Sequence, residues 1–146
     1  MRWRGWLSRA RVWLIGPPRR RTPLEKLGAW GERRAADHLR GQDYRILGRN
    51  VRTRAGEIDL LAETPDGGTI VVVEVKTRVR GVSERSDAVA ADAAVNAHKR
   101  DRLRRAGAIL MSANRWHDRV LRIDIITVEV GMDRRNPRLR HLPGAG

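Results

Sequence analysis

Hydrophobic and polar positions alternate with a helical period in the first part of the chain, which predicts a helix over residues 22–40. Small and apolar residues recur there every three or four positions, the spacing of one helix face. They are Leu24, Leu27, Gly31, Ala35 and Leu39. Thr22 supplies an N-cap hydroxyl, Pro23 lies in the first turn, and Glu25 completes a capping box. Gly41 is expected to end the helix.

The pattern then changes to that of strands. Segments rich in β-branched residues and bounded by turn-forming residues predict four of them. They are residues 44–51, 57–63, 69–78 and 120–130. Between the third and fourth strands, small and apolar residues at helical spacing predict a second helix, with Asn96 as its cap and its end near Ala113. Residues 79–95 leave both a loop and a helix open.

The TPDGG run at residues 64–68 predicts a hairpin between the second and third strands. A two-residue turn and a four-residue loop within this run give the same strand register. In that register Asp59 lies directly opposite Glu74, and Glu57 lies opposite Lys76. The sequence therefore predicts that two acids, separated by fourteen residues in the chain, meet in the sheet.

Two carboxylates in this arrangement point to metal chemistry. Their Cβ atoms would be about 5 Å apart, a distance at which like charges repel unless a cation lies between them. With a main-chain carbonyl, Asp59 and Glu74 would form an oxygen-rich pocket suited to Mg²⁺ or Mn²⁺. Lys76 lies on the same strand face as Glu74 and could orient water or meet a phosphate charge. Glu32 lies on the shoulder of the apolar helix face, half turned toward the core.

The same residues also have a plainer interpretation. Glu and Lys two positions apart on a strand are often an exposed ion pair that contributes little stability. Asp59 could cap or pair locally, and a shifted register would make Glu57 the ligand in its place. The catalytic interpretation gains weight from the predicted opposition of Asp59 and Glu74.

The composition indicates a class of binding partner and a cellular compartment. The 31 Lys and Arg against 17 Asp and Glu give a net charge of +14, which favours a polyanion such as nucleic acid. An Arg-rich coding bias would produce the same excess, so charge alone leaves both explanations open. The chain has no cysteine, which excludes a disulfide framework and a thiolate metal site and fits a cytoplasmic protein.

The predicted domain covers residues 23–130 and is flanked by basic segments. Residues 1–22 contain seven arginines and no acid, with Trp and Leu at helical spacing. This amphipathic pattern is expected to contact a membrane surface, phosphates or a protein partner, and its apolar run is too short for a signal peptide. Residues 131–146 form a basic tail that we expect to be irregular.

Five runs of sequence, in the same order, resemble the YraN-like bacterial proteins of unassigned function. They are GAWGERRAADHLR (28–40), RILGRNVRTRAGEIDLLA (45–62), VVVEVKTR (71–78), HKRDRLRRAGAIL (98–110) and LRIDIITV (121–128). The joint occurrence of GEIDL and EVKTR is specific. The resemblance implies a restriction-endonuclease-like fold, a mixed β-sheet flanked by α-helices, similar to archaeal Holliday-junction resolvases.

The resemblance also implies a set of site residues. In the PD-(D/E)xK pattern, the two acids map onto Asp59 and Glu74, and the lysine maps onto Lys76. Glu32 matches the acid that such nucleases carry on the first helix, and Val75 would offer its carbonyl to the metal. The proline of the motif is absent here. Basic residues expected near the nucleic-acid backbone are Arg52, Arg54, Arg78, Arg80 and Lys99.

Other polar residues are expected to have no part in the site. Asp124 alternates with Ile123 and Ile125, which is typical of a strand with one face in solvent. The four histidines share no metal-ligand spacing, and we interpret them as incidental. They are His38, His98, His117 and His141.

These observations favour a Mg²⁺- or Mn²⁺-dependent endonuclease acting on DNA, with branched or flapped forms as candidate substrates. Related folds dimerise to cut two strands, so a homodimer is one expectation. The alternative is a non-catalytic nucleic-acid-binding module of the same fold, although a pure phosphate binder would gain from losing its acids. A third is an α/β domain whose N-terminal segment docks a partner or a membrane.

Overall fold

The computed structural model describes residues 22–81 and 87–145, without the side chains of residues 87–96. Two helices and five strands make up this part of the chain. They are α1 (Pro23–Arg40), β1 (Arg45–Thr53), β2 (Gly56–Glu63), β3 (Thr69–Val79), α2 (Asp87–Ala113), β4 (Val120–Val130) and β5 (Arg138–Leu142). The expectations for the Arg- and Trp-rich residues 1–21 lie outside the described residues. No helix in the described ranges combines the length and apolar character needed to cross a membrane.

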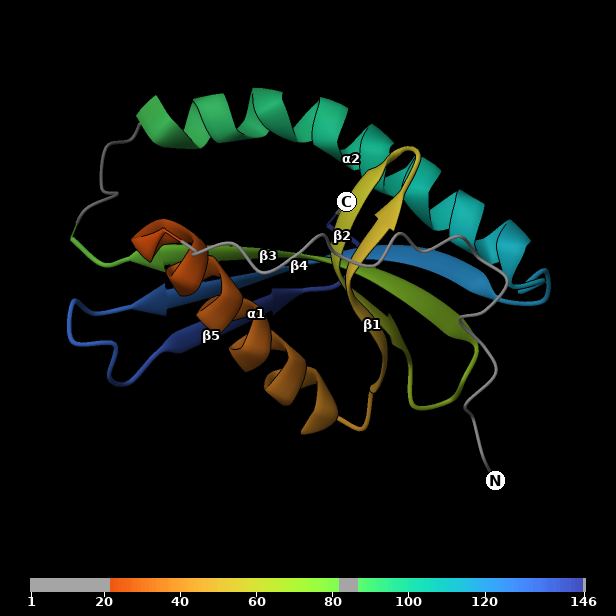
Figure 1. Ribbon diagram of the computed structural model, residues 1–146, viewed down its shortest axis with the longest axis horizontal. Helices are drawn as coiled ribbons and strands as arrows, with labels where there is room; N and C mark the ends of the chain where they lie inside the picture. Colours follow the sequence, from red (N-terminus) through yellow and green to blue (C-terminus); the bar gives the residue numbers. More distant parts are fainter. Residues whose placement is uncertain (1–21, 82–86, 146) are drawn as a thin grey trace.

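The five strands form one mixed sheet in the order β1-β2-β3-β4-β5. All neighbouring pairs are antiparallel except β3 and β4, which run parallel. A parallel pair needs a crossover connection, and α2 provides it. Figure 1 shows α2 along one side of the sheet and α1 on the other. The predicted α/β fold, a mixed sheet flanked by helices, is confirmed.

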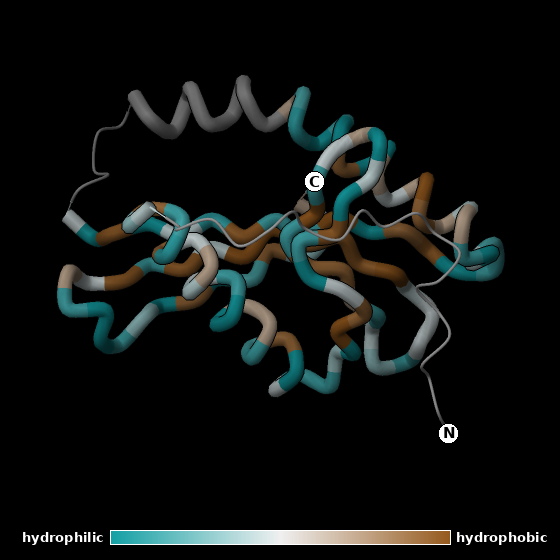
Figure 2. The backbone as a smooth tube through the Cα atoms, in the orientation of Figure 1, coloured by the Kyte–Doolittle hydropathy of each residue, from teal (hydrophilic) through white to brown (hydrophobic). Residues whose placement is uncertain are grey.

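A hydrophobic core lies on each face of the sheet. One cluster joins α2 to the sheet through Leu103, Ala106 and Leu110, and the other joins α1 through Ala35, Ala36 and Leu39. Figure 2 shows hydrophobic colour concentrated in the central strands. The continuous apolar run of β3 follows from this arrangement, because a strand covered on both faces needs apolar residues at successive positions.

α1 begins as its sequence predicts and packs unusually close to β3. Thr22 accepts a hydrogen bond from the Glu25 amide, and Glu25 accepts one from the Thr22 amide, so the capping box is complete. Farther along α1, a Cβ added to Gly31 would lie 1.8 Å from Oγ1 of Thr77 in β3. Only glycine allows this approach, which holds the neighbouring Glu32 close to the sheet.

Two predicted boundaries are wrong. α2 begins at Asp87, so Asn96 lies inside the helix and does not cap it. The C-terminal tail is not irregular throughout, because β5 (Arg138–Leu142) pairs with β4 and extends the sheet. β5 is short and alternates charged and apolar residues, a weak strand signal that basic composition obscured.

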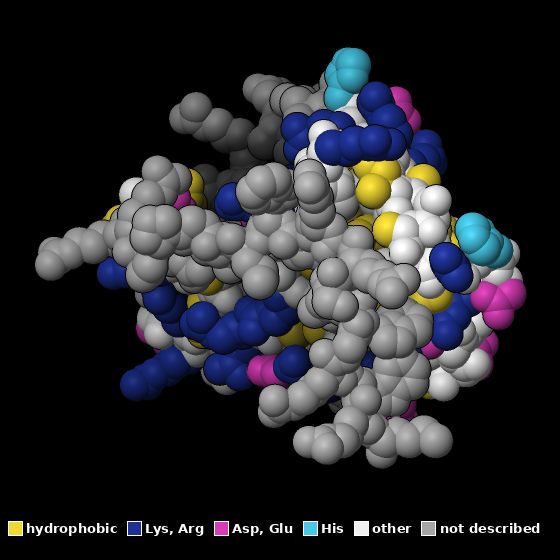
Figure 3. All heavy atoms as spheres, turned by 45° about the vertical axis from the view of Figure 1, so that its right-hand side comes forward, with side chains coloured by type: hydrophobic (Ala, Val, Ile, Leu, Met, Phe, Trp, Pro, Cys, Tyr) yellow, Lys and Arg dark blue, Asp and Glu magenta, His cyan; other side chains and the backbone are white. Residues whose placement is uncertain are grey.

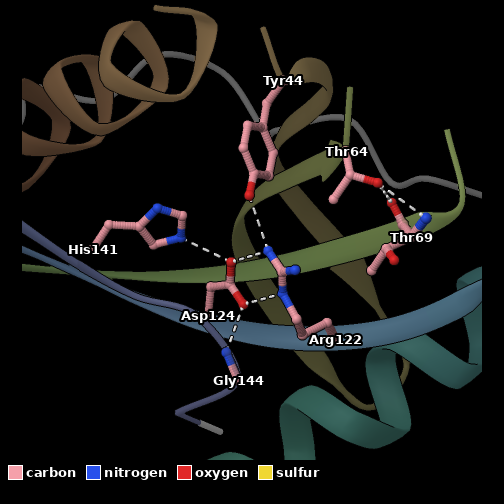
Figure 4. Close-up of polar contacts among 7 residues, drawn as sticks. All are labelled: Tyr44, Thr64, Thr69, Arg122, Asp124, His141 and Gly144. Atoms are coloured by element: carbon pink, nitrogen blue, oxygen red, sulfur yellow. Dashed lines mark hydrogen bonds and ion pairs between the residues drawn. The ribbon is translucent and has the colours of Figure 1, made fainter. Parts of the chain in front are cut away.

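Asp124 does not face solvent as predicted but is fully buried. Its carboxylate accepts two hydrogen bonds of 2.8 Å from Arg122 and one of 2.9 Å from the Gly144 amide, and it contacts His141 Nε2 at 2.8 Å. Tyr44 accepts a further hydrogen bond from Arg122, as Figure 4 shows. Arg122, His141 of β5 and the Gly144 amide surround this carboxylate, so an acid with complete hydrogen bonding replaces the expected exposed one, and His141 is not incidental.

Candidate functional site

The hairpin register places Asp59 and Glu74 at adjacent positions of neighbouring strands. Leu60 pairs with Val73 and Glu63 with Ile70, which confirms the register predicted from the sequence. The loop is the four-residue form, because the Thr64 amide donates to the Thr69 carbonyl at 3.0 Å. The β2–β3 pairing ends at Leu60, so Asp59 and Glu74 occupy the next step, where the two strands begin to separate.

At this step the Asp59 side chain makes the hydrogen bond to β3. Its Oδ2 atom accepts a hydrogen bond of 2.8 Å from the Val75 amide. Ile58 belongs to the core beneath α2, whereas Leu60 belongs to the core beneath α1. Residues two apart in an uninterrupted strand share a face, so the strand is irregular at Asp59. This irregularity directs the Asp59 carboxylate along the sheet toward β3.

Glu74 is almost fully buried, with 6% of its surface exposed. It lies on the α2 side of β3, and its carboxylate forms an ion pair with the Lys99 ammonium of α2. The sequence predicted that Lys99 meets a phosphate; in the structure it reaches the second acid of the motif. A cation from α2 therefore approaches the same carboxylate that is expected to bind a metal.

The electrostatics of Asp59 reflect a crowded acidic site. Burial, reinforced by the charge of Glu74, raises the pKa of Asp59 to about 7. The Val75 amide and Lys99 oppose this rise, and the charge of Glu32 adds to it. Asp59, Glu74 and Glu32 thus lie within electrostatic reach of one another. A divalent cation would relieve the repulsion that raises this pKa.

Glu32 is held at the site by a residue of β1. Its Oε2 atom accepts a hydrogen bond of 2.9 Å from Asn50 Nδ2. Sequence reasoning did not identify Asn50, although Asn is disfavoured in strand interiors and its position within a predicted strand was a usable signal.

The donor set suits a hard divalent cation. Asp59 and Glu74 offer carboxylate oxygens. The N–H and C=O groups of one strand residue point toward the same neighbour, so the Val75 carbonyl faces the side on which its amide meets Asp59. No group of three or more His, Cys, Asp or Glu side chains within the described ranges is arranged to hold a metal ion. The site therefore consists of two acids and a main-chain oxygen, with Glu32 behind them.

The basic residues predicted for the site divide into two groups. Lys76 and Arg78 are half-buried on β3, beyond Glu74. Arg52, Arg54 and Arg80 are exposed, and Arg52 and Arg80 each contact another residue. Arg52 forms an ion pair of 2.9 Å with Glu57, and the β2–β3 pairing ends at Leu60, before it reaches the predicted opposition of Glu57 and Lys76. Arg80 donates to the Asn136 carbonyl at 2.9 Å, away from the carboxylates.

Two exposed arginines lie at the β1–β2 turn and on the part of α2 that borders it. Arg54 is exposed in the turn, and Arg102 lies one helical turn beyond Lys99. Arg102 Nε is 3.7 Å from the position that a Cβ on Gly56 would take, so its guanidinium borders the turn. Figure 3 shows Lys and Arg side chains gathered at the top of the molecule, where α2 lies. Sequence reasoning missed Arg102 because the contact between α2 and the turn is long-range.

The fold and site define an α/β protein with a mixed sheet, two adjacent buried acids where a hairpin opens, and lysines from a strand and a helix beside them. The chain belongs to the uncharacterised protein family UPF0102, whose profile matches residues 31–128. This membership confirms the YraN-like part of the resemblance found in the sequence. The matched range contains all the acids and lysines of the candidate site.

Relatives in several bacteria match most of the chain. A UPF0102 protein of Mycolicibacterium smegmatis is 43% identical over 125 residues, covering 83% of this chain and 93% of the relative. One of Mycobacterium avium is 40% identical over 125 residues, covering 83% and 90%. One of Symbiobacterium thermophilum is 42% identical over 110 residues, covering 75% and 87%.

Proposed function

We propose that the protein is a metal-dependent endonuclease that hydrolyses phosphodiester bonds in DNA. The observation that carries this proposal is the adjacency of Asp59 and Glu74 where the β2–β3 pairing ends, with the pKa of Asp59 raised to about 7 by burial and by Glu74. Buried like charges are unfavourable without a compensating role, and a shared divalent cation would provide one.

Asp59, Glu74 and the Val75 carbonyl would hold Mg²⁺ or Mn²⁺. When bound, such an ion supplies a positive charge that activates water and stabilises negative charge on a phosphate. The Val75 amide fixes the Asp59 carboxylate, so this ligand is oriented before substrate arrives. Lys99 fixes the Glu74 carboxylate in the same way.

The remaining residues are assigned roles around that centre. Lys76 follows Glu74 by two positions on β3, so its ammonium can stabilise charge that develops on the phosphate oxygens. Glu32, held by Asn50, would bind a second ion or a water molecule. Hydrolysis itself needs little covalent participation by the protein, because orientation and charge stabilisation supply most of the rate enhancement.

The wider fold supports the same proposal. A helix, a three-strand meander, a crossover helix and a parallel fourth strand carry the acids and lysine in the order expected for restriction-endonuclease-like enzymes. The net charge of +14 and the exposed Arg54 and Arg102 favour a polyanionic substrate. Branched or flapped DNA and a homodimer remain finer parts of the proposal.

A non-catalytic nucleic-acid-binding module is the second candidate. The ion pair between Lys99 and Glu74 favours it, because it partly neutralises the second acid without a metal. In that case the acids would serve the fold alone, and α2 with the β1–β2 turn would bind phosphates.

A cleavage assay separates these candidates. Labelled single-stranded, duplex, flapped and four-way DNA would be incubated with Mg²⁺ or Mn²⁺ and the wild type, Glu74→Gln or Lys76→Ala. Glu129→Gln makes the same chemical change at an exposed site on β4 and serves as the control. The proposal predicts metal-dependent cutting that falls at least 100-fold in the two site variants, while all proteins still bind DNA. Binding without cutting on every substrate would favour the binding module.

A further inference from the structure

Asn50 lies in the same row as the two acids. The β1–β2 ladder pairs Arg49 with Leu60 and Val51 with Ile58, so Asn50 is directly opposite Asp59. On the far side of Asp59, the β2–β3 register places Glu74 at the next step. Asn50, Asp59 and Glu74 therefore occupy neighbouring positions on three strands, with the Asn50 amide directed to α1 and the Glu74 carboxylate directed to α2.

The backbone of Asn50 is in an unusual conformation for a strand residue. Its φ of 49° lies in the left-handed region, which non-glycine residues adopt at a cost and which Asn tolerates better than most. Asn50 lies opposite Asp59, where the alternation of side chains along β2 is interrupted. Leu60 packs beneath α1, whereas Ile58 packs beneath α2. The left-handed residue thus coincides with the irregularity that directs Asp59 toward the Val75 amide.

The side chain of Asn50 acts in a different direction. Its Nδ2 atom donates a part-buried hydrogen bond of 2.9 Å to Glu32 of α1, eighteen residues earlier in the chain. Gly31 fixes the height of α1 above β3, and Asn50 then fixes the direction of the neighbouring carboxylate. One residue of β1 therefore contacts the helix acid with its side chain and faces the first strand acid with its backbone.

We propose that Asn50 is a positioning residue of the carboxylate site, holding Glu32 through its amide and setting the direction of Asp59 through its left-handed backbone. This inference rests on the proposed function, because it assumes that these acids bind a divalent cation. Asn50 itself donates through nitrogen to Glu32 and is not a metal ligand. Its contribution is to hold Glu32 and to direct Asp59 before an ion arrives.

Two substitutions separate the roles of the side chain and the backbone. Asn50→Gly keeps the left-handed conformation, which glycine adopts readily, and removes the amide that holds Glu32. Asn50→Val keeps a side chain of similar size but opposes the left-handed conformation. Asn136→Gly is the matched control, because Asn136 is an exposed left-handed residue with a φ of 48° in the connection between β4 and β5.

The readouts are thermal unfolding without metal, calorimetric titration with MnCl₂, and cleavage of the best DNA substrate. Asn50→Gly should unfold within about 3 °C of the wild type, bind Mn²⁺ three- to tenfold more weakly, and cleave about tenfold more slowly. Asn50→Val should lose Mn²⁺ affinity and also unfold at a clearly lower temperature. Asn136→Gly should match the wild type in all three measurements.

The two proposals fail in different ways. Wild-type Mn²⁺ affinity and cleavage rate in Asn50→Gly would overturn the role of Asn50 and leave the nuclease proposal standing. Absence of both Mn²⁺ binding and cleavage in the wild-type protein would overturn the nuclease proposal, and with it the positioning role. Asn50→Asp adds a check on the contact with Glu32. Repulsion between the two carboxylates should lower its unfolding temperature relative to Asn50→Gly at neutral pH, and the difference should shrink as the pH falls and they become protonated.

Discussion

Asp59 is the residue at which the competing forces of the site are clearest. Burial and the charge of Glu74 favour its neutral form, while the Val75 amide favours the carboxylate. The result is a pKa of about 7, well above the ordinary value near 4. An acid that is raised in this way stabilises the fold when protonated, and that stabilisation is lost as pH rises through about 7.

The first prediction concerns Asp59→Asn in metal-free buffer. The amide oxygen can still accept from the Val75 amide, but the variant has no charge to repel Glu74. Its free energy of unfolding should exceed that of the wild type by roughly 1–3 kcal/mol at pH 8, and the difference should shrink toward pH 5. Urea unfolding at several pH values measures this.

A control acid should respond in the opposite sense. Hydrogen bonds from Thr64 and the Gly68 amide hold the pKa of the exposed Asp66 below its ordinary value. Asp66→Asn should therefore be no more stable than the wild type at pH 8. If the free energies of unfolding of the wild type and Asp59→Asn changed in parallel with pH, repulsion from Glu74 would not determine the pKa of Asp59.

The sequence identifies Asp59 and Glu74 more readily than it identifies the residues around them. Asp59 and Glu74 follow from strand alternation and the hairpin register, which depend on local turn chemistry. Asn50 and Arg102 could not be identified in this way, because their roles depend on contacts of β1 with α1 and of α2 with a turn. Asp124 was misjudged because alternation along β4 does not reveal its distant partners His141 and Gly144.

At the scale of elements, the distance between α1 and β3 decides where Glu32 lies. Gly31 touches Thr77 with no room for a methyl group, whereas nothing lies within 4 Å of a Cβ added to Gly28 on the same helix. The two glycines therefore provide a matched comparison of packing within one element.

The second prediction is that Gly31→Ala lowers the free energy of unfolding by roughly 2–3 kcal/mol, because the helix must move away from β3. Gly28→Ala should raise it by about 0.5–1 kcal/mol through helix propensity. Adding Thr77→Ala to Gly31→Ala should recover part of the loss. Equal effects of the two glycine substitutions in thermal or urea unfolding would contradict this account of the contact.

The third prediction concerns the attachment of β5. Asp124 accepts hydrogen bonds from Arg122 on the same strand and from the Gly144 amide, and it contacts His141 of β5, so its removal leaves several donors without their acceptor. Asp124→Ala should cost roughly 3–5 kcal/mol, and the milder Asp124→Asn should cost less. Glu129→Ala, at an exposed position on the same strand, should change stability by less than about 0.5 kcal/mol.

Hydrogen exchange would locate the effect of Asp124→Asn. If the Asp124 cluster holds β5, amides of β5 should exchange faster in the variant while those of the central β3 change little. Equal increases in amide exchange across all strands would instead mean that Asp124 stabilises the whole fold.

The sequence predicted six of the seven elements because their periodicities or turns are strong, whereas β5 depends on tertiary pairing with β4.

At the scale of the whole molecule, net charge and its distribution determine the response to salt. The fourth prediction is that DNA binding weakens steeply as salt rises, because a chain with a net charge of +14 displaces counterions from phosphates. Arg102→Ala should weaken binding to all DNA sequences and reduce the log–log salt slope by about 1. Fluorescence anisotropy at several NaCl concentrations measures both.

Arg40→Ala is the matched control for charge. Arg40 is exposed at the end of α1, on the opposite side of the sheet from α2, and pairs locally with Asp37. Its removal should leave the salt slope close to that of the wild type. Equal losses for Arg40→Ala and Arg102→Ala would mean that binding follows total charge and not the surface formed by α2 and the β1–β2 turn.

The central claim is that Asp59 and Glu74 together bind a divalent cation. Its most direct test is a calorimetric titration of MnCl₂ into the wild type and Glu74→Gln at pH 7.5, after circular dichroism has shown that both are folded. The account predicts saturable Mn²⁺ binding to the wild type and at least tenfold weaker binding to the variant. Equal affinities, or no saturable binding by the wild type, would contradict the claim.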